Sequence, residues 1–314
     1  MVRTIRKPGL SRLTGYAGAA LLAAMLLIAP ASEAIAAPKT IGVIMTGDIP
    51  FYKSIHQAFT DSMKGKGDVK YVIQSPAPEP MSWTNAARKL VVVGADMIVA
   101  YGAPATLTTM KETSSIPILF AGVYDPDAMQ IAGKNATGIS SKIPMGELLN
   151  GLKSIRDFKN LGVVFNKAEK DTILQVKEIK ALEGSLGFTM KLFNAGMKDY
   201  AKGISGVDAI LMTTSCSGMC GINDVISVAR VQNLPTAATL SGGKGMIYTI
   251  SADPTEQGQA LAEMAAKVFG GAAPASIPFR NAGSIQRIVN LKEAAAVGVT
   301  VPGSLTGSAT EVIK

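Results

Sequence analysis

Short apolar runs alternate with segments of helical periodicity along most of the chain, and this alternation limits the fold more than any other feature. The runs 40–46, 96–101 and 116–121 are apolar almost throughout, which is typical of strands buried on both faces of a parallel sheet. Each run is followed by a loop and then by a segment with apolar residues at helical spacing. Successive βα units of this kind favour an α/β fold in which helices cover both faces of a parallel sheet.

The alternation occurs twice. Four βα units occupy residues 40–121, and the pattern restarts with a helix predicted at 145–155. Further strands are predicted at 160–165, 188–193 and 207–212, and a last strand at 236–240. The segment 246–251 and a long helix at 254–269 follow. The chain has 314 residues, which at about 150 residues per domain indicates two domains. Hydrophobic residues make up 47% of the chain against 17% charged, so intrinsic disorder is excluded and two similar α/β domains are expected.

The first 36 residues have the order of a secretory signal peptide. A basic segment, 1–15, precedes an apolar stretch, 16–29, and the small-residue sequence Ala34-Ile35-Ala36. This order predicts cleavage after Ala36 and export of the remaining chain. A membrane anchor is the alternative, but a span needs roughly 20 apolar residues. No cysteine lies near the predicted cleavage site, so we expect no lipid anchor and a periplasmic protein.

Charge and composition argue against several functional classes. Thirty-one Lys and Arg against 23 Asp and Glu give a net charge of +8, but the basic residues are spread out and not interleaved with aromatic ones. We therefore expect no nucleic-acid partner. One His and two Cys give little basis for a metal centre, and we expect no cofactor. The G-x-S-x-G signature of a hydrolase is absent, so we expect no enzyme.

Five sequence blocks carry a resemblance to a known family. They are residues 95–105, 116–126, 135–140, 253–259 and 288–299. In order and spacing they resemble the periplasmic substrate-binding proteins of ABC transporters, and among these the proteins that bind tryptophan and other aromatic amino acids. The resemblance implies a type I periplasmic binding protein, with two Rossmann-like lobes, each a parallel sheet flanked by helices, joined by a three-crossing hinge.

The resemblance also implies how the chain is divided. We expect residues 37–139 and 251–279 to form the N-terminal lobe, and residues 140–250 and 280–314 the C-terminal lobe. The three crossings are then expected near Ser140, Ile250 and Phe279.

The function that follows from the resemblance is solute capture. A monomer would close by hinge motion around a small, amino acid-like and possibly aromatic solute, and would deliver it to an ABC permease in the inner membrane. A ligand sensor that feeds a signalling partner is one alternative, and an exported α/β enzyme is another.

Loops at the carboxyl ends of the strands supply the candidate ligand contacts, because ligands of such sheets bind there. Gly102, Ala103, Pro104 and Thr106 begin a predicted helix, where free backbone N–H groups favour a ligand carboxylate. An ordinary helix start is the alternative. Asp125 and Asp253 both precede a proline. Asp125 is a candidate for a ligand ammonium, and a turn residue is its alternative. Asp253 is a candidate because its loop lies near the expected cleft, and a helix N-cap is its alternative.

Further candidates follow the other strands. Tyr52 and Tyr124 could stack on a flat ligand, with core packing as the alternative. The remaining candidates are polar residues in strand-end loops: Asp48, Asn166, Thr172, Thr214 and Ser241. The charged residues Glu169 and Asp171 beside Asn166 are either ligand contacts or solvated charges.

The segment Thr213-Thr214-Ser215-Cys216-Ser217-Gly218-Met219-Cys220 departs from the family. Relatives place a Pro-Thr-Asp-Asn-Thr type of loop here, with an Asp available to a ligand amine. This chain has no acid in the loop before Asp224, so a small organic solute other than an amino acid stays open. In an oxidising compartment we expect a Cys216–Cys220 disulfide. A soft-metal site and two free thiols are the alternatives.

Overall fold

The computed structural model describes residues 1–2, 4, 38–131, 135–243 and 245–314. The predicted signal peptide lies almost wholly outside these residues. Residues Pro38–Lys314 form one compact unit, and the fold described below is the fold of this unit. None of the described helices is both long enough and apolar enough to cross a membrane.

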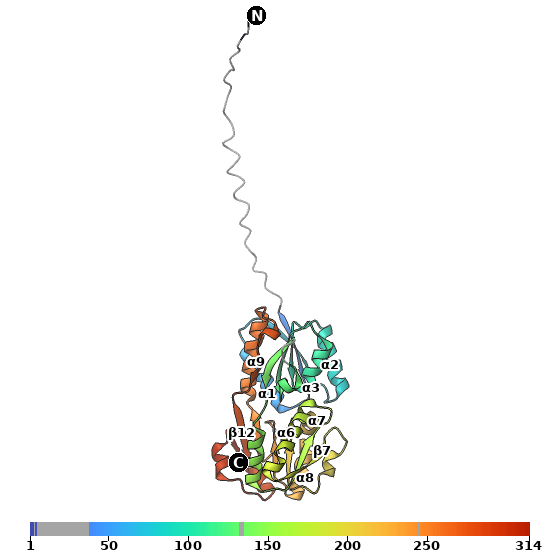
Figure 1. Ribbon diagram of the computed structural model, residues 1–314, viewed down its shortest axis with the longest axis vertical. Coiled ribbons are helices and arrows are strands. Elements are labelled where there is room, and N and C mark those ends of the chain that lie inside the picture. Colours follow the sequence, from blue (N-terminus) through green and yellow to red (C-terminus); the bar gives the residue numbers. More distant parts are fainter. Residues whose placement is uncertain (3, 5–37, 132–134, 244) are drawn as a thin grey trace. The chain divides into compact units, whose positions relative to one another are not determined.

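The N-terminal lobe is built on a six-stranded parallel sheet with the order β11-β5-β4-β3-β1-β2. Its strands are β1 (Lys39–Met45), β2 (Val69–Gln74), β3 (Met97–Tyr101), β4 (Ile118–Val123), β5 (Ala136–Ser140) and β11 (Arg280–Asn281). Its helices are α1 (Pro50–Met63), α2 (Pro80–Val92), α3 (Ala103–Glu112), α4 (Pro126–Met129) and α9 (Pro254–Phe269), with a 3₁₀ turn η2 (Pro274–Ser276). Figure 1 shows α1 and α9 together on one face of the sheet, and α2 and α3 on the other.

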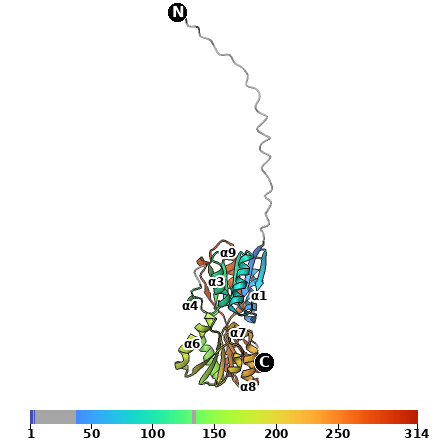
Figure 2. The ribbon, with the colours of Figure 1, turned by 90° about the vertical axis from the view of Figure 1, so that its right-hand side faces the viewer.

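The C-terminal lobe contains a seven-stranded sheet with the order β13-β12-β10-β9-β8-β6-β7, in which only the β10–β12 pair is antiparallel. The strands are β6 (Asn160–Phe165), β7 (Thr189–Asn194), β8 (Ala209–Met212), β9 (Thr236–Ala238), β10 (Tyr248–Ala252), β12 (Ile285–Asn290) and β13 (Glu311–Ile313). The helices are α5 (Met145–Ile155), α6 (Lys170–Leu186), α7 (Cys216–Cys220), α8 (Ile222–Gln232), α10 (Leu291–Ala296) and α11 (Gly303–Ser308), with a 3₁₀ turn η1 (Tyr200–Gly203). Figure 2 shows α6, α7 and α8 within this lobe.

The buried strands place alternate residues on opposite faces of each sheet, as a strand must. In β8, Leu211 packs in one core with Leu148 of α5 and Ile179 of α6. Its neighbour Met212 packs in the other core with Val225 of α8. Two mostly parallel sheets flanked by helices confirm the predicted α/β fold, and the continuous apolar runs are explained because both faces of each sheet are covered.

The chain passes between the two sheets at three places. It leaves the N-terminal lobe after β5, returns between β10 and α9, and leaves again between β11 and β12. The first passage follows Ser140 directly. Ile250 lies inside β10 and Phe279 precedes β11, so the second and third passages come a few residues later than the sequence indicated. The strand pairing explains this difference, because β10 pairs with β9 and β11 pairs with β5 before the chain changes lobe.

Helices α1 and α9 approach closely at a glycine. A Cβ on Gly258 of α9 would lie 2.5 Å from the Ala58 Cβ and 2.5 Å from the Ile55 carbonyl oxygen, both on α1. On α1, Ile55, Phe59 and Met63 recur at a four-residue spacing and are buried, so this stripe faces the sheet and α9. Gly258 therefore fixes the separation of the two helices that cover one face of the N-terminal lobe.

Gly258→Ala is expected to lower the free energy of unfolding by about 1–3 kcal/mol, because the added methyl group overpacks the helix contact. Gly184→Ala is the matched control, since Gly184 lies exposed on α6 and an added methyl group there would have no atom within 4 Å. The control should raise stability by roughly 0.5–1 kcal/mol, the usual gain of alanine over glycine in a helix. Urea unfolding of both variants measures the difference. Equal effects of the two changes would contradict the close packing of α1 on α9.

Candidate ligand-binding site

Loops that follow strands of the two sheets meet where the lobes touch, and we call this contact the interlobe interface. A Cβ on Gly47, in the loop after β1, would lie 3.6 Å from the Cys220 Sγ and 3.8 Å from the Cys216 Cβ of α7. A Cβ on Gly242, after β9, would lie 2.8 Å from the Pro50 Cβ at the start of α1. The carboxyl ends of the strands in both lobes therefore face each other, as the fold class predicts for a ligand site.

Tyr52 is the large side chain of the N-terminal lobe at this interface. Its ring is fully buried, and its hydroxyl lies 3.7 Å from the Cys216 Sγ of the other lobe. Gly102 (φ 92°) and Gly122 (φ 68°) pack against it, since a Cβ would lie 2.7 Å from the Tyr52 hydroxyl at Gly102 and 2.6 Å from the ring at Gly122. Both the backbone angle and the space restrict these two positions to glycine.

Thr46 fixes the start of α3 beside Tyr52. Its hydroxyl donates to the Tyr101 carbonyl (2.7 Å) and accepts from the Ala105 amide (3.2 Å), while its own carbonyl accepts from the Trp83 indole (2.7 Å). The Thr106 hydroxyl donates to the Gly102 carbonyl (2.8 Å). The predicted carboxylate-binding segment 102–106 is therefore buried at the interface, but the Thr106 hydroxyl serves α3 itself.

Glu169 connects α6 to α7 inside the C-terminal lobe. Its carboxylate accepts from the Cys216 amide (2.9 and 3.1 Å to the two oxygens) and from the Asn166 side-chain amide (2.9 Å). The Thr172 hydroxyl closes the same loop by donating to the Asn166 carbonyl (2.7 Å). Glu169 is fully buried, so solvation of this charge, one of the two sequence interpretations, is wrong.

Asp171 is the second buried carboxylate and the least expected feature of the site. One oxygen accepts from the Thr214 hydroxyl (3.1 Å) and the other from the Thr172 amide (3.1 Å). Asp171 is fully buried, so it too is not a solvated charge. Burial, reinforced by the nearby charge of Glu169, raises the pKa of Asp171 to about 7. Burial also raises the pKa of Glu169.

The charges of the two carboxylates affect a titratable group of the opposite lobe, the Tyr52 hydroxyl. The pKa of the Tyr52 hydroxyl is raised by burial and, to a smaller extent, by the charges of Cys216, Asp171 and Glu169. Neither Asp171 nor Glu169 takes part in an ion pair with Lys, Arg or His anywhere in the described ranges. These two carboxylates are thus buried at the interface without a paired cation.

Buried polar atoms without partners also occur here. Within the described part of the chain they are the Ser141 hydroxyl, the Tyr200 hydroxyl and the side-chain NH₂ groups of Gln175 and Gln257. Gln257 accepts from the Gly122 amide (2.9 Å), and the Ser141 amide donates to the Val123 carbonyl (2.7 Å), so both lie against the end of β4. Gln175 accepts from the Thr214 amide (3.0 Å). Buried polar groups normally have partners, so the atoms of Ser141, Gln175 and Gln257 mark a place where a ligand or water belongs.

Other predicted ligand residues have partners of their own. Asp125 caps α4 by accepting from the Ala128 amide (3.0 Å) and pairs with Lys142 (2.7 Å). These contacts agree with its alternative as a turn residue. Asp253 caps α9 by accepting from the Thr255 and Glu256 amides (2.6 and 3.1 Å), which is its N-cap alternative.

Three more candidates lie at the rim or between the lobes. Asp48 is exposed and pairs with Lys53 (2.5 Å). The Tyr124 hydroxyl donates to Glu178 of α6 (2.5 Å), and its ring packs in the core of the C-terminal lobe. Ser241 is buried next to Gly242 at the interface.

The expected disulfide is not formed, because both cysteines are free thiols. Cys216 and Cys220 occupy the two ends of α7, four residues apart on one helical turn. Side chains at this spacing on a helix lie about 5–6 Å apart between Cβ atoms, whereas a disulfide needs roughly 3.5–4.5 Å. Cys216 is buried and Cys220 is exposed. The described residues contain no group of three or more His, Cys, Asp or Glu side chains that could hold a metal ion.

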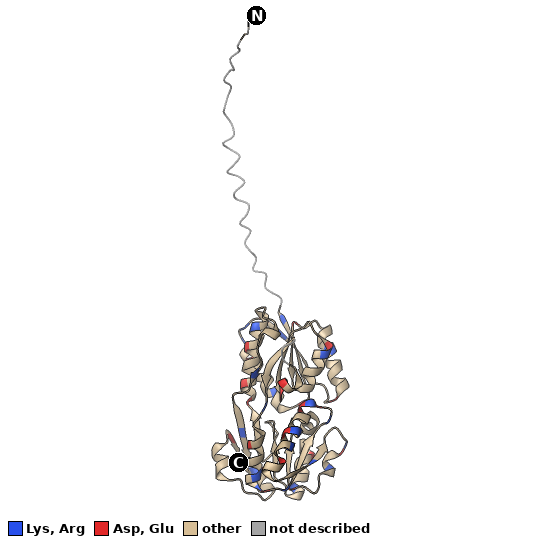
Figure 3. Ribbon diagram, in the orientation of Figure 1, with Lys and Arg blue, Asp and Glu red and all other residues tan. Residues whose placement is uncertain are grey.

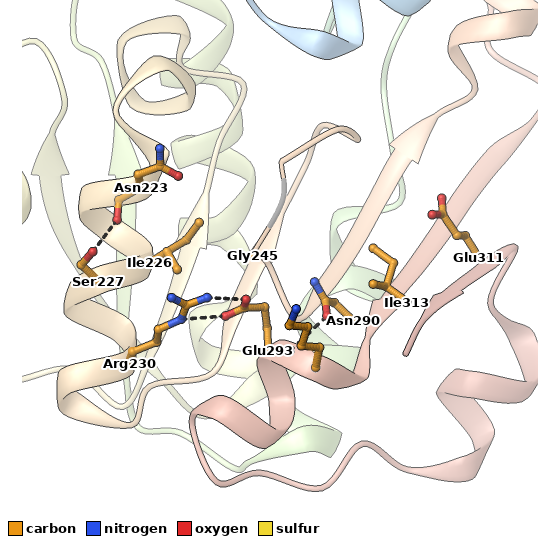
Figure 4. A pocket seen from close by; sticks show the side chains of 10 residues that line it. Asn223, Ile226, Ser227, Arg230, Gly245, Asn290, Glu293, Glu311 and Ile313 are labelled. Atoms are coloured by element: carbon orange, nitrogen blue, oxygen red, sulfur yellow. Dashed lines mark hydrogen bonds and ion pairs between the residues drawn. The ribbon is translucent and has the colours of Figure 1, made fainter.

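A large surface pocket is lined by residues of the C-terminal lobe alone. It has a volume of about 680 Å³ and is formed by α8, α10 and β13 of the C-terminal lobe (Figure 4). The Arg230–Glu293 ion pair (2.5 Å) is part of its lining. A smaller pocket, of about 400 Å³, lies at the interlobe interface between residues 78–80 and the loop 166–168. We place the candidate site at the interlobe interface because three of the four unpaired buried groups, those of Ser141, Gln175 and Gln257, are there.

The sequence matches one family over almost the whole compact unit. Residues 41–313 match the family described as ABC transporter substrate binding protein. The chain belongs to this family. No curated protein matches it by sequence.

Solved structures show the same fold as this substrate-binding protein. An ABC domain from Streptococcus pneumonia in complex with L-Trp has 23% identity and a TM-score of 0.82, over 88% of this chain and 100% of that chain. A conserved domain protein from Vibrio cholerae has 22% identity and a TM-score of 0.83, over 87% and 99%. The ligand-free, open form of CD0873, a substrate binding protein with adhesive properties from Clostridium difficile, has 22% identity and a TM-score of 0.63, over 88% and 99%. These neighbours confirm the predicted type I periplasmic binding protein fold.

Free thiols give a direct prediction for this substrate-binding protein. A thiol-specific reagent should label one cysteine in the native chain, the exposed Cys220, and two after unfolding in denaturant. Labelling of the native thiol should be slow at neutral pH, because burial and the charges of Asp48 and Glu169 raise the pKa of Cys220. Cys220→Ser is the control and should leave no thiol that is labelled in the native chain. No labelling in the unfolded, unreduced chain would instead reveal the disulfide.

Asp171 should make stability depend on pH. Its pKa rises from 3.8 in the unfolded chain to about 7 in the folded protein, so the folded protein holds this proton more tightly. The contribution to the free energy of unfolding is therefore full below about pH 4 and is lost as pH rises through about 7. Asp171→Asn keeps the size of the side chain and removes the ionisation. In urea unfolding at about pH 5 and about pH 8, the wild type should lose more stability than Asp171→Asn between the two pH values. Asp224→Asn, at an exposed position on α8, is the control and should follow the wild type.

Proposed function

We propose that this chain is the periplasmic solute-binding subunit of an ABC importer. A small organic solute binds between the lobes, the hinge closes on it, and the closed form delivers it to a permease in the inner membrane. Membership of the substrate-binding family supports a small-molecule ligand and a transporter partner. The predicted signal peptide supports the periplasmic location.

The observation that carries the proposal is the polar character of the interlobe interface. A permanent contact between lobes would be stabilised by apolar burial, yet here carboxylates, amides and hydroxyls are buried, several without partners. Leaving such groups unpaired costs about 1–3 kcal/mol each, which favours an arrangement that a polar ligand completes. Three connections join the lobes, which is the geometry of a hinge.

The residues that we assign to the ligand come from both lobes and from the hinge. Tyr52 and the segment 102–106 belong to the N-terminal lobe, Thr214 and the loop 166–172 to the C-terminal lobe, and Ser141 to the first crossing. Aromatic packing by Tyr52 supports an amino acid-like solute with a flat or apolar side chain. Lys and Arg are interspersed with Asp and Glu on both lobes (Figure 3), so the described surface offers no single-sign field that would select a ligand at long range.

A wedge at Gly47 tests this mechanism. Gly47 is buried at the interface, and a Cβ there meets α7 at ordinary van der Waals distances, whereas a large side chain would hold the lobes apart. We expect Gly47→Trp to retain folded lobes and to lose solute binding. The control is Gly184→Trp, at an exposed position on α6.

Thermal shift against a panel of amino acids and related solutes measures the effect. A ligand at 100 times its Kd should stabilise the wild type and the control by about 2.7 kcal/mol. Gly47→Trp should show a much smaller thermal shift. In small-angle X-ray scattering with ligand present, Gly47→Trp should have a larger radius of gyration than the wild type. A full ligand shift in Gly47→Trp would contradict binding by closure of this interface. No shift of the wild type with any solute of the panel would contradict the binding function itself.

A further inference from the structure

Asp171 and Gln175 place a hydrogen-bond acceptor and a hydrogen-bond donor side by side at the interlobe interface. The acceptor is the Asp171 carboxylate and the donor is the Gln175 NH₂ group. They lie four residues apart on α6, so their side chains neighbour each other on one helix face. Thr214 binds both: its hydroxyl donates to the Asp171 carboxylate (3.1 Å) and its amide donates to the Gln175 side-chain oxygen (3.0 Å). These contacts turn the NH₂ group of Gln175 away from Thr214, and that group is fully buried without a partner.

The two buried carboxylates are not equivalent. Glu169 accepts hydrogen bonds from the Cys216 amide at both oxygens and from Asn166, so protein donors occupy most of its acceptor positions. Asp171 accepts only two hydrogen bonds, one at each oxygen, from Thr214 and Thr172. An ionised carboxylate offers about four acceptor positions, so Asp171 retains unused ones. Glu169 holds α7 in place, and Asp171 is the carboxylate with capacity for a ligand.

A buried carboxylate needs a cation or a proton. Transfer of an unpaired ion into the protein interior is so costly that the group takes up a proton instead. Throughout the described ranges, Asp171 has no Lys, Arg or His within ion-pair distance. The groups whose charges reach it are Glu169 and, from the packed elements α1 and α7, Tyr52 and Cys216. All of these are acids, so a positive charge at this place must come from outside the chain.

We propose that Asp171 binds a cationic nitrogen of the ligand, most simply a primary ammonium, while the Gln175 amide donates to a carbonyl or carboxylate oxygen of the same molecule. The inference rests on the proposed function and narrows its ligand to solutes that carry both groups. An α-amino acid has them at a suitable separation. The acid that the loop 213–220 lacks is thus supplied by the first turn of α6.

The inference fixes the sign of a pH effect. In the ligand-free protein Asp171 is largely protonated below pH 7, because burial raises its pKa to about 7. An ammonium ion favours the ionised carboxylate, so ligand binding releases the proton. Affinity for an amino acid should therefore increase as pH rises from about 5.5 to about 8, a range in which the ammonium of a free amino acid stays charged. A ligand held by a protonated Asp171 would show the opposite slope.

The first experiment compares matched probes by titration calorimetry. The probes are L-phenylalanine and L-leucine, each with the carboxylic acid that lacks only its amino group, 3-phenylpropionate and 4-methylpentanoate. We expect at least one amino acid to bind and its des-amino partner to bind roughly 30-fold more weakly or worse, the ratio typical of losing one partner of a buried charge pair. Equal binding of the partner acid, or binding of neither amino acid, overturns the inference.

The second experiment uses variants and proton counting. Asp171→Asn should weaken amino acid binding by a similar factor and abolish its pH dependence, while Asp224→Asn, exposed on α8, should change neither. Calorimetry in two buffers of different ionisation enthalpy should show proton release near pH 6.5 for the wild type and none for Asp171→Asn. The pH dependence of affinity is measured on the wild type alone. The inference can therefore be tested even if Asp171→Asn does not fold. Proton uptake, or affinity that falls with rising pH, overturns the inference.

These outcomes separate the inference from the proposed function. Binding of uncharged or anionic solutes that Gly47→Trp abolishes would retain capture between the lobes and reject the role of Asp171. Failure of every solute to bind would reject both.

Discussion

The burial of two carboxylates without a cation is the constraint on which the interlobe interface depends. Glu169 is stabilised by the amide of Cys216 and the side chain of Asn166, and so it joins the loop after β6 to α7. Asp171 has fewer donors and lies one turn from an unpaired amide on the same helix. Donors of the C-terminal lobe occupy most acceptor positions of Glu169, but they leave acceptor positions of Asp171 unused. The structure therefore concentrates its unfavourable electrostatics where two lobes meet, as functional sites commonly do.

The N-terminal lobe contributes shape more than charge. Gly102 and Gly122 leave space for the Tyr52 ring, and Thr46 fixes the start of α3 beside it. The result is an aromatic surface with a single hydroxyl, opposite the polar surface of the C-terminal lobe. This division suits a ligand with one polar end and one apolar end, because each lobe can hold a different part of the molecule.

The sequence predicted the fold well and the site only in part. Continuous apolar strands such as β3 are buried on both faces, so local pattern and tertiary environment agree and the α/β class could be read directly. The roles of Asp171 and Glu169 could not be read from the sequence, because a charged loop with Lys167 and Lys170 has the pattern of a solvated surface. Their burial depends on contacts with Thr214 and Cys216, which are more than 40 residues away in the sequence. Gln175 and Gln257 gave no signal, since a single amide within a helix is unremarkable until its neighbours in space are known. The predicted disulfide is absent because Cys216 and Cys220 lie at the two ends of helix α7, which the sequence spacing alone did not indicate.

The contact between Trp83 and Thr46 has a consequence for observing the protein in solution. Trp83 is the only tryptophan in the chain; its ring is buried, and its indole N–H donates to the carbonyl of Thr46, one residue before the interface glycine Gly47. Indole emission is sensitive to its hydrogen-bond partner and to the polarity around the ring. Any displacement of the loop after β1 therefore changes the environment of the sole intrinsic fluorophore, and the chain carries its own optical reporter at the base of the N-terminal lobe's ligand-facing surface.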